Sequence, residues 1–464
     1  MSSLAIDAKT QSAAANLGRL PAVAGRRGLK PANWIAMAVV CVAAFVIYSL
    51  LWAQAPLSMT DTVSYLHPVQ DFLAHHRFTQ LHGRLPGLTV FILMVGTGRA
   101  YFYATLALHL IGVGALALLM FRLGVRAAFV WTFAFLGVLP PYVQNAAYLS
   151  SETFTEAFLA LGFVLLCAFV LKRRWPYCVF ASLCFVWAGL ARPAILFVPF
   201  ALALILVVVS WKRFLRAAAV LVLAPVLFVG GWILYTGLEF HYFGLSYFSG
   251  YQLSCSTIGM YEYIDNPIAR EELLKARAGM YVAGMTPNDA IWKAVPHLEQ
   301  RLGLNEVDLG RFLLRMNVKL ITHHPEAFLE EFTRAMVMYW FPYLTKVLSY
   351  RSALKLVWDG VQLLVAAVFL FEVGVLGGFA IGSKFLDRGL VSRVSDKLLI
   401  YLLAIGAIFQ TEITSCAVVG GSNPRFRSVT DPLTIFCVVV VADWALTAWR
   451  ASHRDPVLRE EVRS

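Results

Sequence analysis

Charged residues are scarce in this chain. They make up 14% of its 464 residues, against 59% for hydrophobic residues, and the mean hydropathy is +0.69. This composition lies well outside the range of soluble globular proteins and predicts a polytopic membrane protein. The chain also lacks an internal repeat, which many transporters carry.

Cysteine is rare as well, and its placement argues against a metal site. The seven cysteines form no CxxC pair and show no metal-ligand spacing with histidine. All except Cys255 lie in or beside apolar segments, where cysteine acts as a small hydrophobic residue, although a Cys255–Cys416 disulfide stays open. The histidine pairs at 75–76 and 323–324 are adjacent and do not converge on one helix face. We therefore predict neither a bound metal nor a cofactor.

The net charge of +12 would suit a nucleic-acid-binding protein, but the position of the charges does not. Many basic residues stand in short clusters beside apolar segments, at 26–27, 172–174, 212–213 and 450. This pattern is typical of loops on the cytoplasmic side of a membrane. The sequence therefore predicts the lipid bilayer, and no nucleic acid, as a partner.

About ten apolar segments are predicted to cross the bilayer. They are residues 33–53, 101–121, 127–139, 154–171, 177–190, 195–209, 215–235, 356–381, 397–416 and 430–449. The first is too long and too uniformly apolar for a cleaved signal sequence. With the N-terminus inside, the basic turns after every second span also fall inside. Both termini are then cytoplasmic.

The predicted fold is all-α, with five parts along the chain. These are a cytoplasmic tail (1–32), a membrane domain with a first external loop (33–235), an external helical segment (236–355), C-terminal transmembrane helices (356–449) and a second cytoplasmic tail (450–464). In the first external loop, residues 68–78 are expected to form an interfacial helix, and residues 85–95 either a second interfacial helix or a re-entrant one. Residues 325–341 form an amphipathic helix that either lies in the membrane interface or packs on the external segment.

Polar side chains gather at the external ends of the predicted spans. A carboxylate beside a bilayer is costly unless it faces water or a partner, which makes it a functional candidate. Arginine binds phosphate with a fixed fork, and a nearby carboxylate can take a proton from a hydroxyl. This combination suits a substrate with an anionic head and a lipid tail. The candidate site residues are Asp61, Tyr65, Arg84, Glu152, Glu156, Arg192, Arg425 and Arg427.

Three of these candidates have a structural alternative close at hand. Asp61 precedes TVSYL and is either a catalytic base or the cap of a short helix. Arg84 either binds phosphate or snorkels to the membrane surface. Arg192 either contacts phosphate or forms a structural bridge with Glu152 or Glu156.

Four of the other candidates are also open between two interpretations. Glu152 and Glu156 lie one helical turn apart and share a face. They either line a sugar site or pair with an arginine, Arg192 or Arg84. Arg425 and Arg427 either bind phosphate or anchor the end of a span.

Five motifs occur in order along the chain. TDTVSYLHPVQDFL carries Asp61 and Tyr65 as an acid-x-x-x-Tyr pattern, and GRLPGLT places Arg84 just before Leu85-Pro86. AAYLSSETFTEAFLALG, GLARPAILFVPF and GGSNPRFRSVTDPL follow at the starts of later spans. Together they resemble the glycosyltransferase C superfamily, in particular bacterial enzymes related to protein O-mannosyltransferases and to the aminoarabinose transferase of lipid A. The resemblance covers about residues 33–235 and 397–449.

The resemblance implies a membrane glycosyltransferase that takes its sugar from a polyprenyl-phosphate carrier. Asp61 would be the base that deprotonates an acceptor hydroxyl in an inverting displacement, and Arg84 stands where the family has a phosphate-contacting lysine. The acceptor would be a lipid, a glycan or a protein. The family's second first-loop acid is missing beside Asp61, so the resemblance implies one carboxylate and arginines rather than a metal. A bacterial inner membrane, with the site on the periplasmic face, is the expected location.

Two other classes of protein use similar substrates. A transporter or flippase for lipid-linked sugars would carry charged or broken segments near the middle of the membrane. A polymerase or ligase of surface polysaccharide would use a lipid diphosphate donor. The polar residues gather at one face instead, which argues against a transporter, and the position of Asp61 in the first loop argues against the polymerase or ligase.

Overall fold

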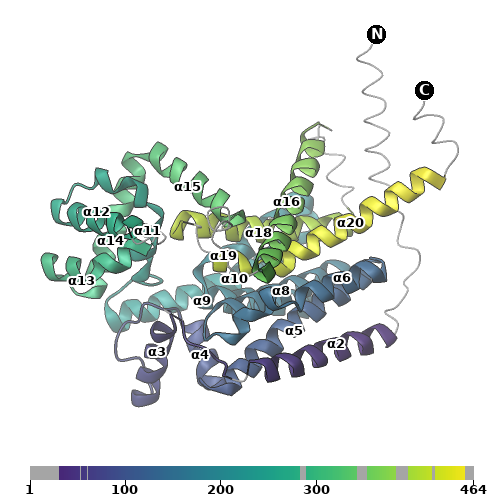
Figure 1. Cartoon of the computed structure of the whole chain (residues 1–464), viewed down its shortest axis with the longest axis horizontal. Coiled ribbons are helices and arrows are strands. Elements are labelled where there is room, and N and C mark those ends of the chain that lie inside the picture. The colour runs from purple at the N-terminus through teal and green to yellow at the C-terminus, as the bar shows by residue number, and fades with distance from the viewer. Residues whose placement is uncertain are drawn as a thin grey trace, which may run out of the picture.

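The structure, a computed structural model, describes residues 31–52, 54–59, 61–282, 289–341, 353–382, 395–420 and 424–454. These residues form helices and no strand, with one isolated β-bridge between Leu57 and Tyr148. Figure 1 shows a bundle of long helices with a smaller group of helices at one end. The all-α prediction is confirmed for the described residues.

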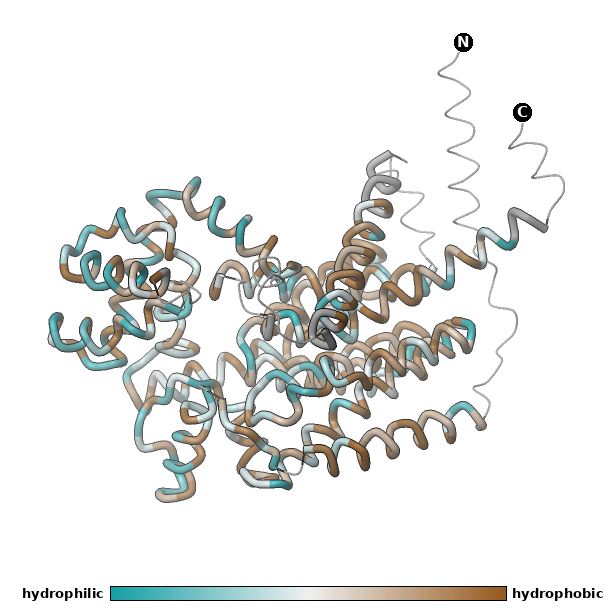
Figure 2. The backbone as a smooth tube through the Cα atoms, in the orientation of Figure 1, coloured by the Kyte–Doolittle hydropathy of each residue, from teal (hydrophilic) through white to brown (hydrophobic). Residues whose placement is uncertain are grey.

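Among the described residues, nine helices make up the long bundle. Their backbone is predominantly apolar in colour (Figure 2). Helix α8 lies at the centre of the bundle, between α5 and α9, with Phe154, Phe163 and Cys167 completely buried. Glu152 and Glu156 lie at the N-terminal end of α8, and both residues are buried. The bundle helices are α2 (Pro31–Leu51), α5 (Arg99–Arg122), α6 (Ala127–Gly137), α8 (Glu152–Lys172), α9 (Trp175–Ala191), α10 (Val198–Phe240), α16 (Ala353–Gly382), α18 (Asp396–Val419) and α20 (Asp431–Arg454).

Each of the ten predicted spans overlaps a bundle helix. Two of them overlap α10, which is broken at Ser210, where the backbone leaves the helical region. By length and composition, six described helices can cross a membrane, or seven if the bent pair of α6 with residues 140–147 is one span. Helix α9 is apolar but shorter. The membrane character is therefore confirmed, whereas the number of ten spans stays a prediction.

Short helices connect the long ones at the end of the bundle that carries the candidate site. Helix α4 starts at Pro86, where the missing N–H and fixed φ of proline suit a first turn. It packs against α9 so closely that a Cβ on Gly87 would lie 2.6 Å from the backbone of Leu190. This contact fixes the position of the chain just after Arg84. The short helices are α3 (Thr62–His75), α4 (Pro86–Val95), α7 (Pro140–Val143), η1 (Gln144–Ala147), η2 (Pro193–Ile195) and α19 (Pro424–Ser428).

The second group of helices, here called the helical domain, has a hydrophobic core of its own. Along α14, Leu309, Leu313 and Leu320 are buried at helical spacing. The core also buries Asn317, whose amide donates to Ser254 Oγ at 2.8 Å. The domain comprises α11 (Phe248–Ser256), η3 (Ile258–Tyr263), α12 (Pro267–Val282), α13 (Ala290–Leu302), α14 (Glu306–His323) and α15 (Pro325–Trp340).

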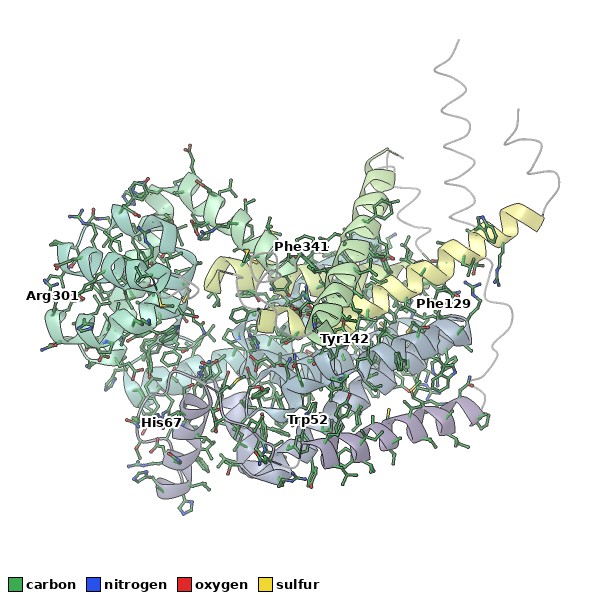
Figure 3. All side chains as sticks on the ribbon, in the orientation of Figure 1. Trp52, His67, Phe129, Tyr142, Arg301 and Phe341 are labelled. Carbon is green, nitrogen blue, oxygen red and sulfur yellow. The ribbon has the colours of Figure 1, made fainter. Side chains whose placement is uncertain are left out.

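The helical domain returns to the bundle through α15. The start of this helix packs on the core of the helical domain through Ala327 and Phe328, as one of the two predictions had it. Its end, Tyr339 and Trp340, is buried in the bundle core. In Figure 3, His67 on α3 and Arg301 on the helical domain lie toward the same end of the molecule. All seven cysteines are free, and Cys255 and Cys416 are both buried without a disulfide.

The contact between α11 and α14 gives a test of the domain's packing. A Cβ on Gly250 would lie 2.1 Å from the carbonyl oxygen of Gly310, whereas a Cβ on Gly279 of α12 meets nothing within 4 Å. We expect Gly250→Ala to destabilise the protein by about 1–3 kcal/mol through overpacking. Gly279→Ala, the matched control, should stabilise it by up to about 1 kcal/mol because alanine favours helix. Denaturant titration in detergent measures both, and equal effects would contradict the packing.

Candidate functional site

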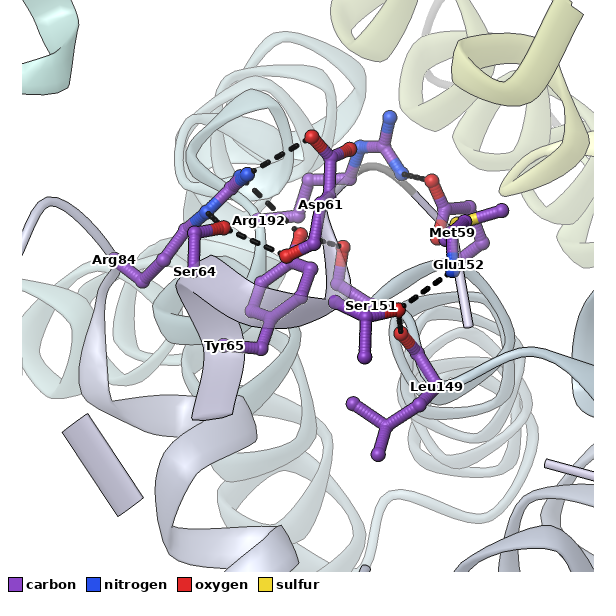
Figure 4. Close-up of polar contacts among 10 residues, drawn as sticks. Met59, Asp61, Ser64, Tyr65, Arg84, Leu149, Ser151, Glu152 and Arg192 are labelled. Carbon is purple, nitrogen blue, oxygen red and sulfur yellow. Dashed lines mark hydrogen bonds and ion pairs between the residues drawn. The ribbon is translucent and has the colours of Figure 1, made fainter. Parts of the chain in front are cut away.

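Asp61 and Arg84 face each other where α3 begins and where the chain enters α4 (Figure 4). Arg84 Nη2 lies 3.3 Å from Asp61 Oδ1. Arg84 Nε donates to Ser64 Oγ at 2.8 Å and Nη1 to Tyr65 Oη at 3.3 Å, with the guanidinium 4.3 Å from the centre of the Tyr65 ring. The Asp61 side chain is 36% exposed and that of Arg84 19%. The first turn of α3 thus holds an arginine in a fixed, half-buried orientation.

The helix-cap alternative does not account for Asp61. Asp61 occupies the N-cap position of α3, but its side chain makes no capping hydrogen bond. Thr62 makes the side-chain hydrogen bonds at this helix start instead. Its Oγ1 accepts from Met59 N at 2.8 Å and donates to the carbonyl of Leu149 at 3.1 Å. The Asp61 carboxylate therefore lies toward Arg84.

A buried carboxylate, Asp71, closes the loop that leads from α3 to Arg84. It accepts from Thr79 N at 2.8 Å and Thr79 Oγ1 at 2.5 Å, and it also contacts His82 Nε2 at 2.8 Å and His75 Nδ1 at 3.1 Å. Burial alone would raise the pKa of Asp71, but the bonds from Thr79 and His82 outweigh it and hold this pKa well below its usual range. The loop is thereby fixed just before Gly83-Arg84.

The helical domain supplies another wall of the site. Ser246 donates a short hydrogen bond to the carbonyl of Gly83. The partly buried ring of Phe248 lies 5.4 Å from the Arg84 guanidinium. The arginine is thus held between two aromatic rings, one from α3 and one from α11.

A second ion pair lies deeper and is joined to the first. Arg192 Nη1 lies 3.1 Å from Glu152 Oε1, and the Arg192 guanidinium is 4.8 Å from the centre of the Phe426 ring. Both charged side chains are largely buried. Tyr65 Oη and Ser151 Oγ are 3.0 Å apart, and Ser151 directly precedes Glu152 (Figure 4). The predicted bridge between Arg192 and Glu152 is therefore present, and it connects to the Asp61–Arg84 pair.

Glu156 lies apart from this group, although it shares a helix face with Glu152. Its Oε1 is 2.7 Å from His109 Nδ1, and His109 Nε2 is 2.9 Å from the carbonyl of Gly137. The predicted partners Arg192 and Arg84 are thus replaced by a histidine of α5. Glu156 links α8 to α5 and to the end of α6.

Arg427 is also held by internal contacts. It donates to Asp431 Oδ1 at 3.2 Å, to the carbonyl of Trp340 at 2.9 Å and to Gln362 Oε1 at 3.2 Å. Its side chain is almost completely buried. Arg427 therefore ties α15, α16 and α20 together. The Arg425 side chain lies outside what the structure describes.

Sequence reasoning missed several side chains of the site. Ser64 and Ser151 stand next to predicted residues, so their proximity in sequence was an available signal. Phe426 gave the same signal, because it stands between Arg425 and Arg427. Phe248 and His109 gave none, because each reaches the site or its neighbours through long-range packing.

Two arginines and two carboxylates supply the charge of the site. Asp61 and Arg84 lie at its half-exposed mouth, and Glu152 and Arg192 form its buried floor. In the described part of the chain, no group of three or more His, Cys, Asp or Glu side chains is placed to hold a metal ion. The arrangement can bind an anion and accept a proton beside it.

Comparison with known proteins finds no matching family model and no matching curated protein. Among solved structures, the chain is similar to the crystal structure of ArnT from Cupriavidus metallidurans bound to undecaprenyl phosphate. Sequence identity is 15%, the match covers 84% of this chain and 78% of that chain, and the TM-score is 0.38. Similarity at this level assigns no role to a residue of this chain.

The Asp71 contacts predict how the loop before Arg84 responds to mutation and pH. Asp71→Asn removes a buried, charge-assisted acceptor and should cost about 2 kcal/mol locally. We expect trypsin to cut faster after the exposed Arg77, as measured by peptide mapping.

The wild-type loop should stay protected from pH 8 down to about pH 4. The lowered pKa of Asp71 keeps its contribution fully present above the ordinary carboxyl value and loses it only as the pH falls further, through the folded-state pKa. Because trypsin is inactive in acid, hydrogen exchange is the appropriate measurement at low pH. Loss of protection between pH 7 and pH 5 would contradict this assignment.

Proposed function

We propose that this protein is an integral membrane glycosyltransferase that moves a sugar from a polyprenyl-phosphate carrier to a hydroxyl group of a lipid, glycan or protein. The Asp61–Arg84 pair carries this proposal. It joins a carboxylate to a held guanidinium at the end of an apolar helical bundle. Transfer from a lipid phosphate needs these three features together: a base, a phosphate-binding cation and a surface for the lipid.

Arg84 is the proposed phosphate ligand. Ser64 and Tyr65 hold its Nε and Nη1, whereas Nη2 lies toward Asp61. A donor phosphate can take the place of Asp61 at Nη2 without disturbing the other two bonds. This exchange avoids reorganising the guanidinium when the donor arrives.

A crevice of about 10 Å³, room for about one water molecule, lies beside Arg84. It is lined by Pro86 and Thr89 of α4 and by Trp232 and Phe240 of α10. Thr89 Oγ1 is buried and has no hydrogen-bond partner among the described residues. The crevice thus offers a polar atom close to the arginine and aromatic rings beyond it. The crevice is too small for a phosphate or a lipid chain, so we place the phosphate end of the carrier outside it, at its mouth beside Arg84.

The reaction is a direct displacement at the anomeric carbon. The acceptor oxygen forms a bond to this carbon from the face opposite the phosphate, and its proton passes to the Asp61 carboxylate. The bond from the anomeric carbon to the phosphate oxygen breaks, and the polyprenyl phosphate leaves with the bonding electrons. Arg84 stabilises the charge that grows on this leaving group. One displacement inverts the anomeric configuration.

The other predicted residues support this site to different degrees. We propose that Tyr65, Glu152 and Arg192 form the wall and floor of the sugar site, because they connect to Arg84 through Ser151. Glu156 and Arg427 hold helices together through internal partners. Arg425 remains a proposed phosphate ligand from the sequence alone. We propose a bacterial inner membrane as the location, with the site on the periplasmic face.

Substitution of the base tests this proposal. Asp61→Asn keeps the shape and a contact to Arg84 but cannot take a proton. With purified protein and a panel of polyprenyl-phosphate sugars, we expect transfer to fall roughly 10²- to 10⁴-fold. Membrane insertion should be unchanged, and the melting temperature should fall only slightly as Arg84 loses its ion pair.

Asp308→Asn is the matched control. Asp308 pairs with Arg311 on the exposed surface of α14, so its loss should leave transfer intact. Full activity of Asp61→Asn would contradict the proposed base. A flippase would instead move the lipid-linked sugar across vesicles without consuming the donor, and that result would favour transport.

A further inference from the structure

The helical domain holds a second cavity, separate from the Asp61–Arg84 site. Its volume is about 370 Å³. One wall is a face of α14, and the other is the stretch after η3 together with the start of α15. A volume of this size is typical of pockets that hold a small ligand.

Two parallel rows of side chains on α14 form the first wall. Arg315, Lys319 and His323 recur at every fourth residue and make a basic row. Phe312, Met316 and Leu320 recur in the same way and make an apolar row beside it. Residues four apart are neighbours on a helix face, so each row is continuous along the cavity. The ligand therefore meets cations and an apolar surface side by side.

The opposite wall combines an aromatic surface with a single carboxylate. The rings of Tyr263 and His324 are stacked, with centroids 4.3 Å apart, and Tyr263 is half exposed. Lys319 Nζ donates to Asp265 Oδ2 at 2.7 Å, and this bond lowers the pKa of Asp265. Arg315 makes no hydrogen bond or ion pair with the described residues. Two permanent cations thus stand against one carboxylate, which leaves an excess of positive charge.

We propose that this cavity binds an anionic sugar unit of the acceptor, with the anion on Arg315 and Lys319 and the sugar ring against Tyr263. The C–H face of a pyranose is apolar and matches an aromatic ring, and guanidinium and ammonium groups bind phosphate or carboxylate oxygens. Asn266 and Asp265 line the same cavity and offer hydrogen-bond partners to sugar hydroxyls. This inference rests on the proposed function, because it narrows the acceptor to a glycan or glycolipid that carries negative charge.

Binding to the full-length protein in detergent, without any donor, tests the inference. The probes are glucose 6-phosphate, glucose and inorganic phosphate, each titrated by calorimetry. We expect glucose 6-phosphate to bind saturably at one site, at least tenfold more tightly than either of the other two. The Arg315→Gln/Lys319→Gln double variant should bind it roughly ten- to a hundredfold more weakly. Tyr263→Ala should weaken glucose 6-phosphate and leave inorganic phosphate unchanged.

Arg334→Gln is the control, because Arg334 is an exposed cation on α15 that pairs with Glu331 outside the cavity. It should bind like the wild type, and melting curves establish that every variant is folded. Absence of saturable binding, equal binding of glucose or phosphate, or unchanged binding by the double variant would overturn the inference.

The experiments distinguish an error in the inference about the cavity from an error in the proposed function. Asp61→Asn should keep full glucose 6-phosphate binding while losing transfer. This result supports both the inference about the cavity and the proposed function. If the wild-type protein transfers sugar but binds none of the probes, only the inference about the cavity is overturned. Saturable binding of glucose 6-phosphate with no transfer from any donor overturns the proposed function alone.

Discussion

The Arg84 guanidinium is the point on which the site depends. A half-buried cation needs an anionic partner, and in this structure Asp61 provides it. Ser64 and Tyr65 fix the rest of the group, and Phe248 of the helical domain covers one side. In the proposed mechanism, a donor phosphate takes the place of Asp61 at Arg84, and the Asp61 carboxylate gives up this ion pair beside the incoming acceptor. We propose that donor binding and the release of the base are coupled through this one guanidinium.

Rigid supports on each side keep this geometry in place. Asp71 ties the loop before Arg84 through Thr79 and His82, and Gly87 lets α4 lie directly on α9 just after it. The contact between Tyr65 and Ser151 connects α3 to the buried floor formed by Glu152 and Arg192. A site whose groups are held by such a second layer of contacts loses little energy in ordering when the substrate binds.

Short-range patterns were readable from the sequence, and long-range packing was not. Asp61 and Tyr65 share one helical turn, and the pairing of Arg192 with Glu152 follows from opposite charges at neighbouring helix ends. Glu156 was expected to act with Glu152, yet a histidine on another helix holds it. Phe248 is one of 33 phenylalanines, and nothing local marks it as the one that covers Arg84. The break at Ser210 was readable, because it falls between the predicted spans 195–209 and 215–235. The number of spans stays a prediction because α9 is short and α6 forms a bent pair with residues 140–147.

The exchange of Asp61 for a phosphate at Arg84 is tested most directly by donor-phosphate binding. The measurement is the affinity of a short-chain polyprenyl phosphate for the wild type, Asp61→Asn and Arg84→Gln, in the same detergent. Asp61→Asn should bind at least as tightly as the wild type, because the competing carboxylate is gone. Arg84→Gln should bind roughly tenfold or more weakly, because a charge-assisted contact is lost. Weaker binding by Asp61→Asn together with unchanged binding by Arg84→Gln would contradict the exchange.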